Sequence, residues 1–284
     1  MPRRLLLLLA AFLLCRDGIA QQIPDYDLGG ASKPRPDMSF RKENQYKRVH
    51  QSSLRFILRG DLDRTEQFLD QYLAEHPDDA ETLYMLGILH GQRGNIPTAE
   101  DFLKRAIAAG LPDDRIIAGP RDMITPLLQT ELLKNLMSEF RTRLVHGPLL
   151  GNVSGTSASF WVRTARESDI QITVQEASPG SRRLTSDTVR SAAAEDYTAV
   201  ATVTGLKPDT EYHYSVILDG ADCAKQGPQK FRTLPAAGTP SQFVIAFGGG
   251  AGYVPEHERM WDTIRHFDPH AILLLGDNVY IDDP

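Results

Sequence analysis

The sequence predicts a multidomain chain with an α-helical repeat region, then an antiparallel β-sandwich, and then the first strand–helix–strand unit of an α/β domain. A motif recurs 34 residues apart within residues 46–143, residues 144–235 hold short segments of alternating polarity, and two continuous apolar runs occur within residues 242–284. At 284 residues the chain is long enough to bury several cores. Its net charge of -6 argues against a nucleic-acid-binding surface, because such proteins normally carry a basic face.

Residues 1–20 have the composition of a signal peptide. Arg3 and Arg4 form a short basic segment, residues 5–14 are all apolar, and small residues precede the expected cleavage site after Ala20. The apolar run is shorter than the roughly 20 residues that span a bilayer, so we expect no stable membrane span once it is removed. The sequence therefore predicts an exported protein, either periplasmic or extracellular.

A repeat follows the linker that we expect at residues 21–45. Residues 59–62 (RGDL) recur as residues 93–96 (RGNI) at an offset of 34. A 34-residue period of paired helices is the signature of the tetratricopeptide repeat, so residues 46–143 are predicted to be a helical region of this type. The second copy has large and small residues where the two helices of this repeat need to cross closely: Leu83, Leu86, Gly87, Ala99, Leu103 and Ala106.

The first copy is a poorer match, because Thr65 and Tyr72 replace the small residues Ala99 and Ala106 of the second. Two copies leave a repeat face uncovered, so the helical run Arg121–Arg143 is expected to supply a capping helix. Two interpretations of this region stay open at this point. It is either a protein-binding groove or a helical spacer docked on the next domain.

Residues 144–235 predict a small β-sandwich, because strand-like segments alternate there with turn residues. The expected strands are residues 157–164, 169–177, 199–206, 211–218 and 229–235. Leu206 lies six residues before Tyr212 with Pro-Asp between them, an arrangement that resembles the tyrosine corner of fibronectin type III domains. Tyr212 and Trp161 are therefore expected in the core of the sandwich.

Residues 242–284 predict the start of an α/β domain. The short apolar runs at residues 242–248 and 271–276 are typical of parallel strands covered on both faces. Between them Pro255 suits the first position of a helix, and an apolar stripe at helical spacing follows it. One parallel strand–helix–strand unit accounts for the whole segment.

Asp277 follows the second apolar run directly, and Tyr280 comes three residues later. Ligands in open α/β sheets gather at the carboxyl ends of the strands, where both residues are expected. A carboxylate and a phenolate are hard, anionic oxygen ligands suited to ferric iron or another hard cation. We predict Asp277 and Tyr280 as metal ligands.

This segment resembles a known family. Residues 276–280 (GDNVY) are similar to the GDxxY motif of the binuclear metallophosphoesterases, and residues 144–148 (LVHGP), 160–164 (FWVRT) and 206–212 (LKPDTEY) are similar to the N-terminal domain of the PhoD-like alkaline phosphatases. The resemblance implies that Asp277 bridges two metals and that Tyr280 binds iron, with calcium or another divalent cation as the partner metal.

The same resemblance implies an activity. It is the hydrolysis of phosphate monoesters or diesters by water activated between two metals. The remaining ligands of such sites lie on later strands, so the chain as given is expected to be incomplete and inactive alone. We expect no catalytic residue within it.

One residue departs from the family pattern. Many relatives carry a metal-ligating cysteine at the position of Gly250, and glycine has no side chain to donate. His257 is a conceivable substitute, but we expect a solvent-facing histidine there. The loss of a ligand keeps an alternative open, namely an exported protein-interaction module with a degenerate phosphatase domain. Nucleotide binding by the glycine-rich residues 248–252 is disfavoured, because Tyr253 occupies the third glycine position.

Overall fold

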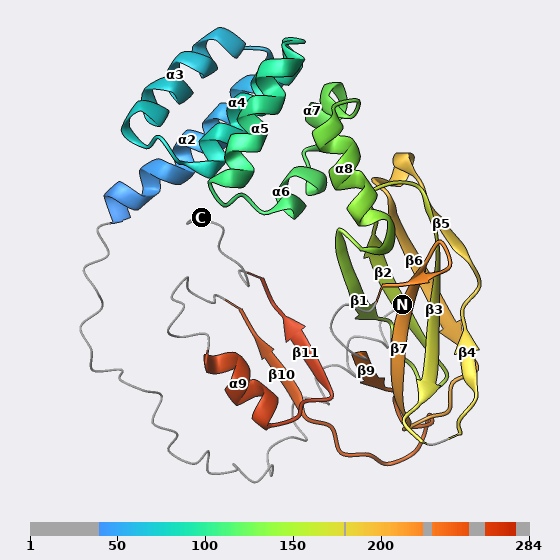
Figure 1. The fold of residues 1–284 in the computed structure, drawn as a ribbon. Coiled ribbons are helices and arrows are strands. Elements are labelled where there is room, and N and C mark those ends of the chain that lie inside the picture. The colour runs from blue at the N-terminus through green and yellow to red at the C-terminus, as the bar shows by residue number, and fades with distance from the viewer. Residues whose placement is uncertain (1–39, 179, 224–228, 250–258, 277–284) are drawn as a thin grey trace, which may run out of the picture. The chain divides into compact units, whose positions relative to one another are not determined.

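The computed structural model describes residues 40–178, 180–223, 229–249 and 259–276 (Figure 1). The described residues from Arg41 onward belong to one structural unit. Within this described part, no helix has both the length and the apolar composition to cross a bilayer.

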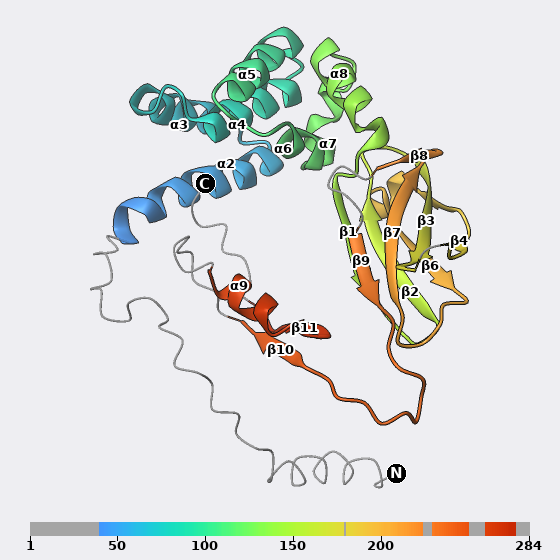
Figure 2. The ribbon, with the colours of Figure 1, turned by 60° about the horizontal axis from the view of Figure 1, so that its bottom comes forward.

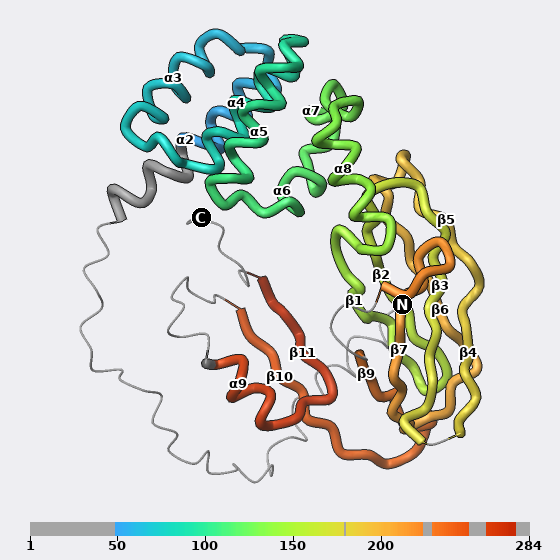
Figure 3. The backbone as a smooth tube through the Cα atoms, viewed as in Figure 1, coloured from blue at the N-terminus to red at the C-terminus, as the bar shows by residue number. Residues whose placement is uncertain are grey.

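The helical region is built from helix pairs, as the 34-residue period predicts. The first pair is α2 (Phe40–Arg59) and α3 (Leu62–Glu75), and the second is α4 (Ala80–Gln92) and α5 (Ile96–Ala108). Figure 3 traces α3, α4 and α5 as successive rods joined by short turns. The prediction of a tetratricopeptide-like helical region is confirmed.

The second pair crosses closely because its contact face is made of small residues. A Cβ atom added to Gly87 would lie 2.8 Å from Cδ2 of Leu103 on the facing helix, so a larger residue would have to displace the Leu103 side chain. Ala99 and Ala106 on α5 are fully buried in the same contact. α4 is buried from Thr82 to Gly91, and it contacts α3 and α7 (Arg121–Ile124) as well as α5.

The first pair approaches less closely, in agreement with its bulkier residues. Tyr72 stands where the second copy has Ala106. Ser53 occupies the position of Gly87, is fully buried, and donates its hydroxyl to the carbonyl of Val49. The first copy therefore keeps one small residue that the sequence comparison missed.

Asp79 caps the amino end of α4 and joins the two pairs. Its carboxylate accepts the backbone N–H of Thr82 at 2.7 Å and lies 3.1 Å from Nε2 of His50 on α2. Burial alone would raise the pKa of Asp79, but hydrogen bonds from His50 and Thr82 outweigh it and lower this pKa to about 2. Asp79 is therefore a charged cap held by both repeats.

The segment expected to form one capping helix is more divided than predicted. It contains the short helix α7 (Arg121–Ile124), the 3-10 turns η1 (Thr125–Leu127) and η2 (Phe140–Thr142), and the helix α8 (Glu131–Glu139). The short helix α6 (Asp113–Ala118) precedes it, and these elements together are called the capping segment below. Pro120 has no N–H to donate and separates α6 from α7. Gly119 before it has a φ of +112°, which other residues rarely adopt.

An antiparallel β-sandwich follows the helices. One sheet has the strand order β1 (His146–Gly151), β2 (Ser157–Arg163), β6 (Thr198–Thr204), and the other has the order β4 (Arg183–Thr185), β3 (Ser168–Glu176), β7 (Glu211–Leu218), β8 (Ala221–Asp222). On the second sheet β5 (Val189–Ser191) pairs with β3 and β9 (Gln229–Arg232) pairs with β7. A 3-10 turn, η3 (Ala193–Glu195), precedes β6. The predicted sandwich resembling fibronectin type III domains is confirmed.

Inward-facing residues of both sheets form the core of the sandwich, and Tyr212 belongs to them. Its side chain is only 1% exposed, and its hydroxyl accepts the backbone N–H of Lys207 at 2.9 Å. The ring lies against Phe231 of β9, with 5.7 Å between the ring centroids. The predicted tyrosine corner is present.

The expectation that Trp161 is a core residue is wrong. Its neighbours Phe160 and Val162 are fully buried, and side chains alternate between the two faces of a strand, so Trp161 lies on the outer face. Its cross-strand partners Leu149 and Val200 are both exposed.

The last described elements are β10 (Ile245–Gly248), α9 (Arg259–His266) and β11 (Ala271–Leu274). Figure 2 shows β10 and β11 side by side, and they pair in parallel, with Phe247 opposite Leu273. The expectation that both strands are buried is wrong for the described residues, because Phe247 is 73% and Leu273 53% exposed. Parallel strands become buried when helices and further strands cover them, and the described residues supply no third strand to this sheet.

Candidate functional site

The carboxyl ends of β10 and β11 form the candidate site, because they lead directly into the predicted metal ligands. Gly248 pairs with Leu274, and the N–H of Leu275 donates to the carbonyl of Gly248 at 2.8 Å. The parallel ladder thus continues to the last residues before Asp277.

Two glycines meet at this edge. A Cβ atom on Gly249 would lie 2.6 Å from the carbonyl oxygen of Gly276, a contact that real Cβ atoms do not make. Gly276 itself has a φ of +110°, a conformation that glycine adopts readily and other residues rarely do. The glycines after each strand therefore allow the two backbones to touch and turn at the point where the predicted ligands begin.

The predicted site residues lie outside the described residues. Asp277 and Tyr280 follow the last described residue, and Gly250 and His257 fall in the gap between β10 and α9. Within the described ranges, no group of three or more His, Cys, Asp or Glu side chains is placed to hold a metal ion. The described edge is therefore limited to backbone, and the hard oxygen donors predicted for iron or calcium, Asp277 and Tyr280, remain a prediction from the sequence.

His270 lies at the opposite end of the strand pair. Its backbone N–H donates to the carbonyl of Val244 at 2.8 Å, and its ring Nδ1 accepts the N–H of Val244 at 3.2 Å. The ring also packs edge-on against Phe243. His270 therefore closes the amino end of the ladder and stands away from the candidate site.

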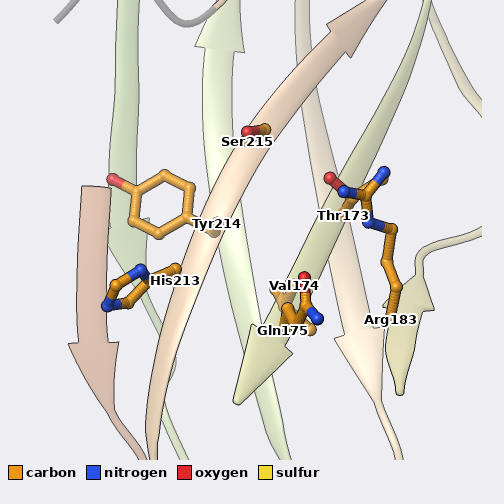
Figure 4. Close-up of a pocket in the computed structure, with 7 residues that line it drawn as sticks. All are labelled: Thr173, Val174, Gln175, Arg183, His213, Tyr214 and Ser215. Atoms are coloured by element: carbon orange, nitrogen blue, oxygen red, sulfur yellow. The ribbon is translucent and has the colours of Figure 1, made fainter. Parts of the chain in front are cut away.

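The sandwich has a shallow hollow of about 210 Å³ on the outside of its larger sheet (Figure 4). Its walls come from three neighbouring strands and consist of Thr173, Val174, Gln175, Arg183, His213, Tyr214 and Ser215. Figure 4 shows Arg183 and His213 on opposite sides of the hollow. Their polar groups do not converge on one point, and burial raises the pKa of Tyr214, so its phenol stays neutral. The hollow is therefore a weak candidate for chemistry.

Comparison with known proteins gives two family matches, each over less than half of the chain. Residues 141–236 match a family described as a domain of unknown function (DUF7800), which covers the sandwich, and residues 56–118 match the tetratricopeptide repeat. The second match covers α3 to α6 and agrees with the observed helix pairs. No curated protein was found to match the chain.

Several solved structures are similar in part. The structure of PhoD is 18% identical with a TM-score of 0.39, over 50% of this chain and 28% of that chain. A fibronectin type III domain of the human KIAA0970 protein is 10% identical with a TM-score of 0.29, over 44% of this chain and 96% of that one. The fn3 domain of human contactin 1 is 22% identical with a TM-score of 0.23, over 33% and 79% respectively. Because their TM-scores are all below 0.5, these likenesses do not indicate a function for this chain.

Proposed function

We propose that residues 242–284 open the catalytic domain of an exported, metal-dependent phosphoesterase. The observation that carries the proposal is the meeting of Gly249 and Gly276 at the carboxyl ends of two parallel strands, immediately before Asp277 and Tyr280. This edge is where ligands bind in α/β sheets. On this proposal the GDNVY sequence would supply two hard oxygen donors at this edge.

Asp277 and Tyr280 are the residues of this chain that would hold metal in the proposal. Two bound cations would supply charge to screen a phosphate ester and to activate water. The chain's own contribution is positional. The close approach of Gly249 to Gly276 brings the ends of the two strands together directly before Asp277 in the sequence.

The exposure of β10 and β11 supports a larger domain around them. A parallel pair with apolar residues such as Phe247 and Leu273 in water would associate with whatever covers it. We propose that further strands and helices of a phosphoesterase domain cover this pair and bring the remaining metal ligands. On this proposal the 284-residue chain alone hydrolyses no phosphate ester at an enzymatic rate.

A comparison of variants in the complete gene product tests the function. The substrates are a chromogenic phosphate monoester and the corresponding diester, and the variants are Asp277→Asn and Tyr280→Phe. Asp282→Asn is the matched control, because it removes one nearby charge outside the GDNVY motif. We expect hydrolysis by the wild type and the control, and a loss of at least about 100-fold in Asp277→Asn, as when an essential group is removed. A wild type that hydrolyses neither ester, or an Asp277→Asn variant of wild-type rate, would contradict the proposal.

A protein-binding role for the helical region is a second candidate, favoured by the tetratricopeptide repeat match at residues 56–118. Repeats of this kind commonly present surfaces to other proteins. The burial of α4 from Thr82 to Gly91 restricts the surface available for it. A partner would therefore contact α2, α3 or α5. Substitutions on their exposed faces that leave all partner binding unchanged would refute this role.

A further inference from the structure

The capping segment follows the second repeat at nearly the same spacing. Its first helix, α6, begins at Asp113, and α8 begins at Glu131. The start of α6 lies within one residue of the position 34 residues after the start of α4, and the start of α8 has the same relation to the start of α5. The turn that leads into α8 follows η1, at the position that corresponds to the turn between α4 and α5 in the second repeat. The segment thus has the order and the length of another helix pair.

Buried positions recur with the same offset. Ile117, Met123, Phe140 and Val145 are buried and stand 34 residues after Leu83, Leu89, Ala106 and Leu111, which are buried as well. Both sets belong to one continuous apolar core. Residues 113–142 are therefore a third tetratricopeptide-like repeat whose sequence has diverged.

The divergence is concentrated where the second repeat needs small residues. Leu133 and Phe140 replace Ala99 and Ala106, and Arg121 replaces Gly87. Even a Cβ atom at position 87 would press on Leu103 of the facing helix, so an arginine at this point of the repeat requires a different helix arrangement. The break at Gly119 and Pro120 provides it, because it ends α6 and lets α7 start in a new direction.

Arg121 contacts the sandwich with its whole guanidinium group. One terminal nitrogen donates to the carbonyl of Thr164 at 2.7 Å and the other to the carbonyl of Ala165 at 3.0 Å. Nε lies 3.0 Å from Oδ1 of Asp196 as an ion pair, without the alignment of a hydrogen bond. The group stacks over the ring of Tyr197 at 4.6 Å, and the side chain is only 16% exposed.

The receiving turn on the sandwich is held from its own side too. Arg163 on β2 pairs with the other carboxylate oxygen of Asp196 at 2.7 Å. Asp196 and Tyr197 both adopt left-handed backbone conformations, with φ of 51° and 56°, which are unfavourable for these residues without supporting contacts. Ala165 is buried in the core of the helical region, so apolar contact accompanies the polar one.

We propose that the third repeat is remodelled into a docking joint, in which Arg121 fixes the helical region to the sandwich so that the two unfold as one cooperative unit. The sandwich then covers the end of the repeat array, as a capping repeat does in other arrays. The joint is independent of the proposed hydrolytic activity, since none of its residues belongs to the β10–β11 edge. The helical region is on this account a docked part of the domain and not a module on a free linker.

Denaturant unfolding of the full chain with two probes tests the joint. Far-ultraviolet circular dichroism follows the helices, and the fluorescence of Trp161 follows the sandwich once Trp261, the other tryptophan, is changed to Phe. We expect the two transitions to coincide in this background. In Arg121→Met the helical transition should move to lower denaturant and separate from that of Trp161. Arg121→Lys should separate them less, because it keeps the charge but loses the planar fork.

Arg141→Met is the matched control, since it removes an exposed arginine from the same repeat, and its transitions should coincide. Asp196→Asn removes the charge that pairs with Arg121 from the sandwich side. This variant tests the joint if Arg121→Met fails to fold. Separation in Asp196→Asn then supports the joint, and coincidence overturns it. Transitions that are already separate in the parent protein, or that still coincide in a folded Arg121→Met, would also overturn it.

Discussion

The tyrosine corner offers a clean test of how the sandwich is stabilised. Tyr212→Phe removes one oxygen and leaves the ring, which is 1% exposed and packed against Phe231, in place. The backbone N–H of Lys207 then loses its acceptor at 2.9 Å. A polar group left without a partner costs about 1–3 kcal/mol, and water reaching the partly exposed turn reduces this to the lower half of the range. We expect a loss of about 1–2 kcal/mol in the free energy of unfolding.

Tyr214→Phe is the matched control on the same strand and the same face. Tyr214 is 9% exposed, and its hydroxyl has no hydrogen bond to any described residue. Removing this hydroxyl should be nearly neutral or slightly stabilising. Denaturant titrations of both variants, followed by the fluorescence of Trp161 with Trp261→Phe as background, give the comparison. If Tyr212→Phe lowers the free energy of unfolding no more than Tyr214→Phe does, the hydrogen bond from Lys207 to the Tyr212 hydroxyl does not stabilise the sandwich.

Two further predictions concern the helical region. Gly87→Ala places a Cβ atom 2.8 Å from Cδ2 of Leu103 and should lower the free energy of unfolding by about 1–3 kcal/mol, as measured by denaturant unfolding. Gly151→Ala is the control, because the space around Gly151 is open, and it should leave the free energy of unfolding nearly unchanged. Equal effects of the two substitutions would show that the close helix crossing is unimportant for stability. The pKa of Asp79 is about 2 in the folded protein and about 4 in an unfolded chain. Its contribution, on the order of 1–2 kcal/mol for this largely buried carboxylate, is present above pH 4 and lost as the pH falls towards 2. Asp79→Asn should remove that part of the acid dependence of unfolding, and a variant with an unchanged pH profile would contradict this assignment.

The helix pairs were predictable where the repeat uses residue types that its geometry demands. Gly87, Ala99 and Ala106 mark a close crossing that only small residues allow, so the second copy was visible in the sequence. The third copy was missed because Leu133 and Phe140 removed those markers. Only its buried apolar positions repeat, and such positions are too common in helices to reveal a period without the structure.

The strands of the sandwich were predictable from the alternation of apolar and polar residues. The same alternation places Trp161 outside the core, against the prediction made from its size. Phe160 and Val162 point into the core, so Trp161 between them has to point outward whatever its size. The strand β1 was missed because His146–Gly151 contains Gly147 and Pro148, which are rare within strands. The turn at Asp196 that receives Arg121 gave no sequence signal, because its role depends on a residue far away in the chain.

The order of strands and helix in residues 242–284 followed from the sequence, but the burial of the strands did not. An apolar run indicates that a strand is suited to burial, but the strand becomes buried only where helices or further strands cover it. Phe247 and Leu273 are exposed because the described residues provide none. The pair of glycines that defines the candidate edge had a sequence signal in the Gly-rich residues after each strand, although their contact became visible only in the structure.

The metal content of the complete, purified gene product would show whether Asp277 binds metal. Elemental analysis of the wild type, Asp277→Asn and the control Asp282→Asn would count the ions per chain and identify them. We expect more than one ion per chain in the wild type and the control, iron among them, and a clear loss in Asp277→Asn. A wild type without stoichiometric metal, or an Asp277→Asn variant that retains all of its ions, would refute the proposed metal centre.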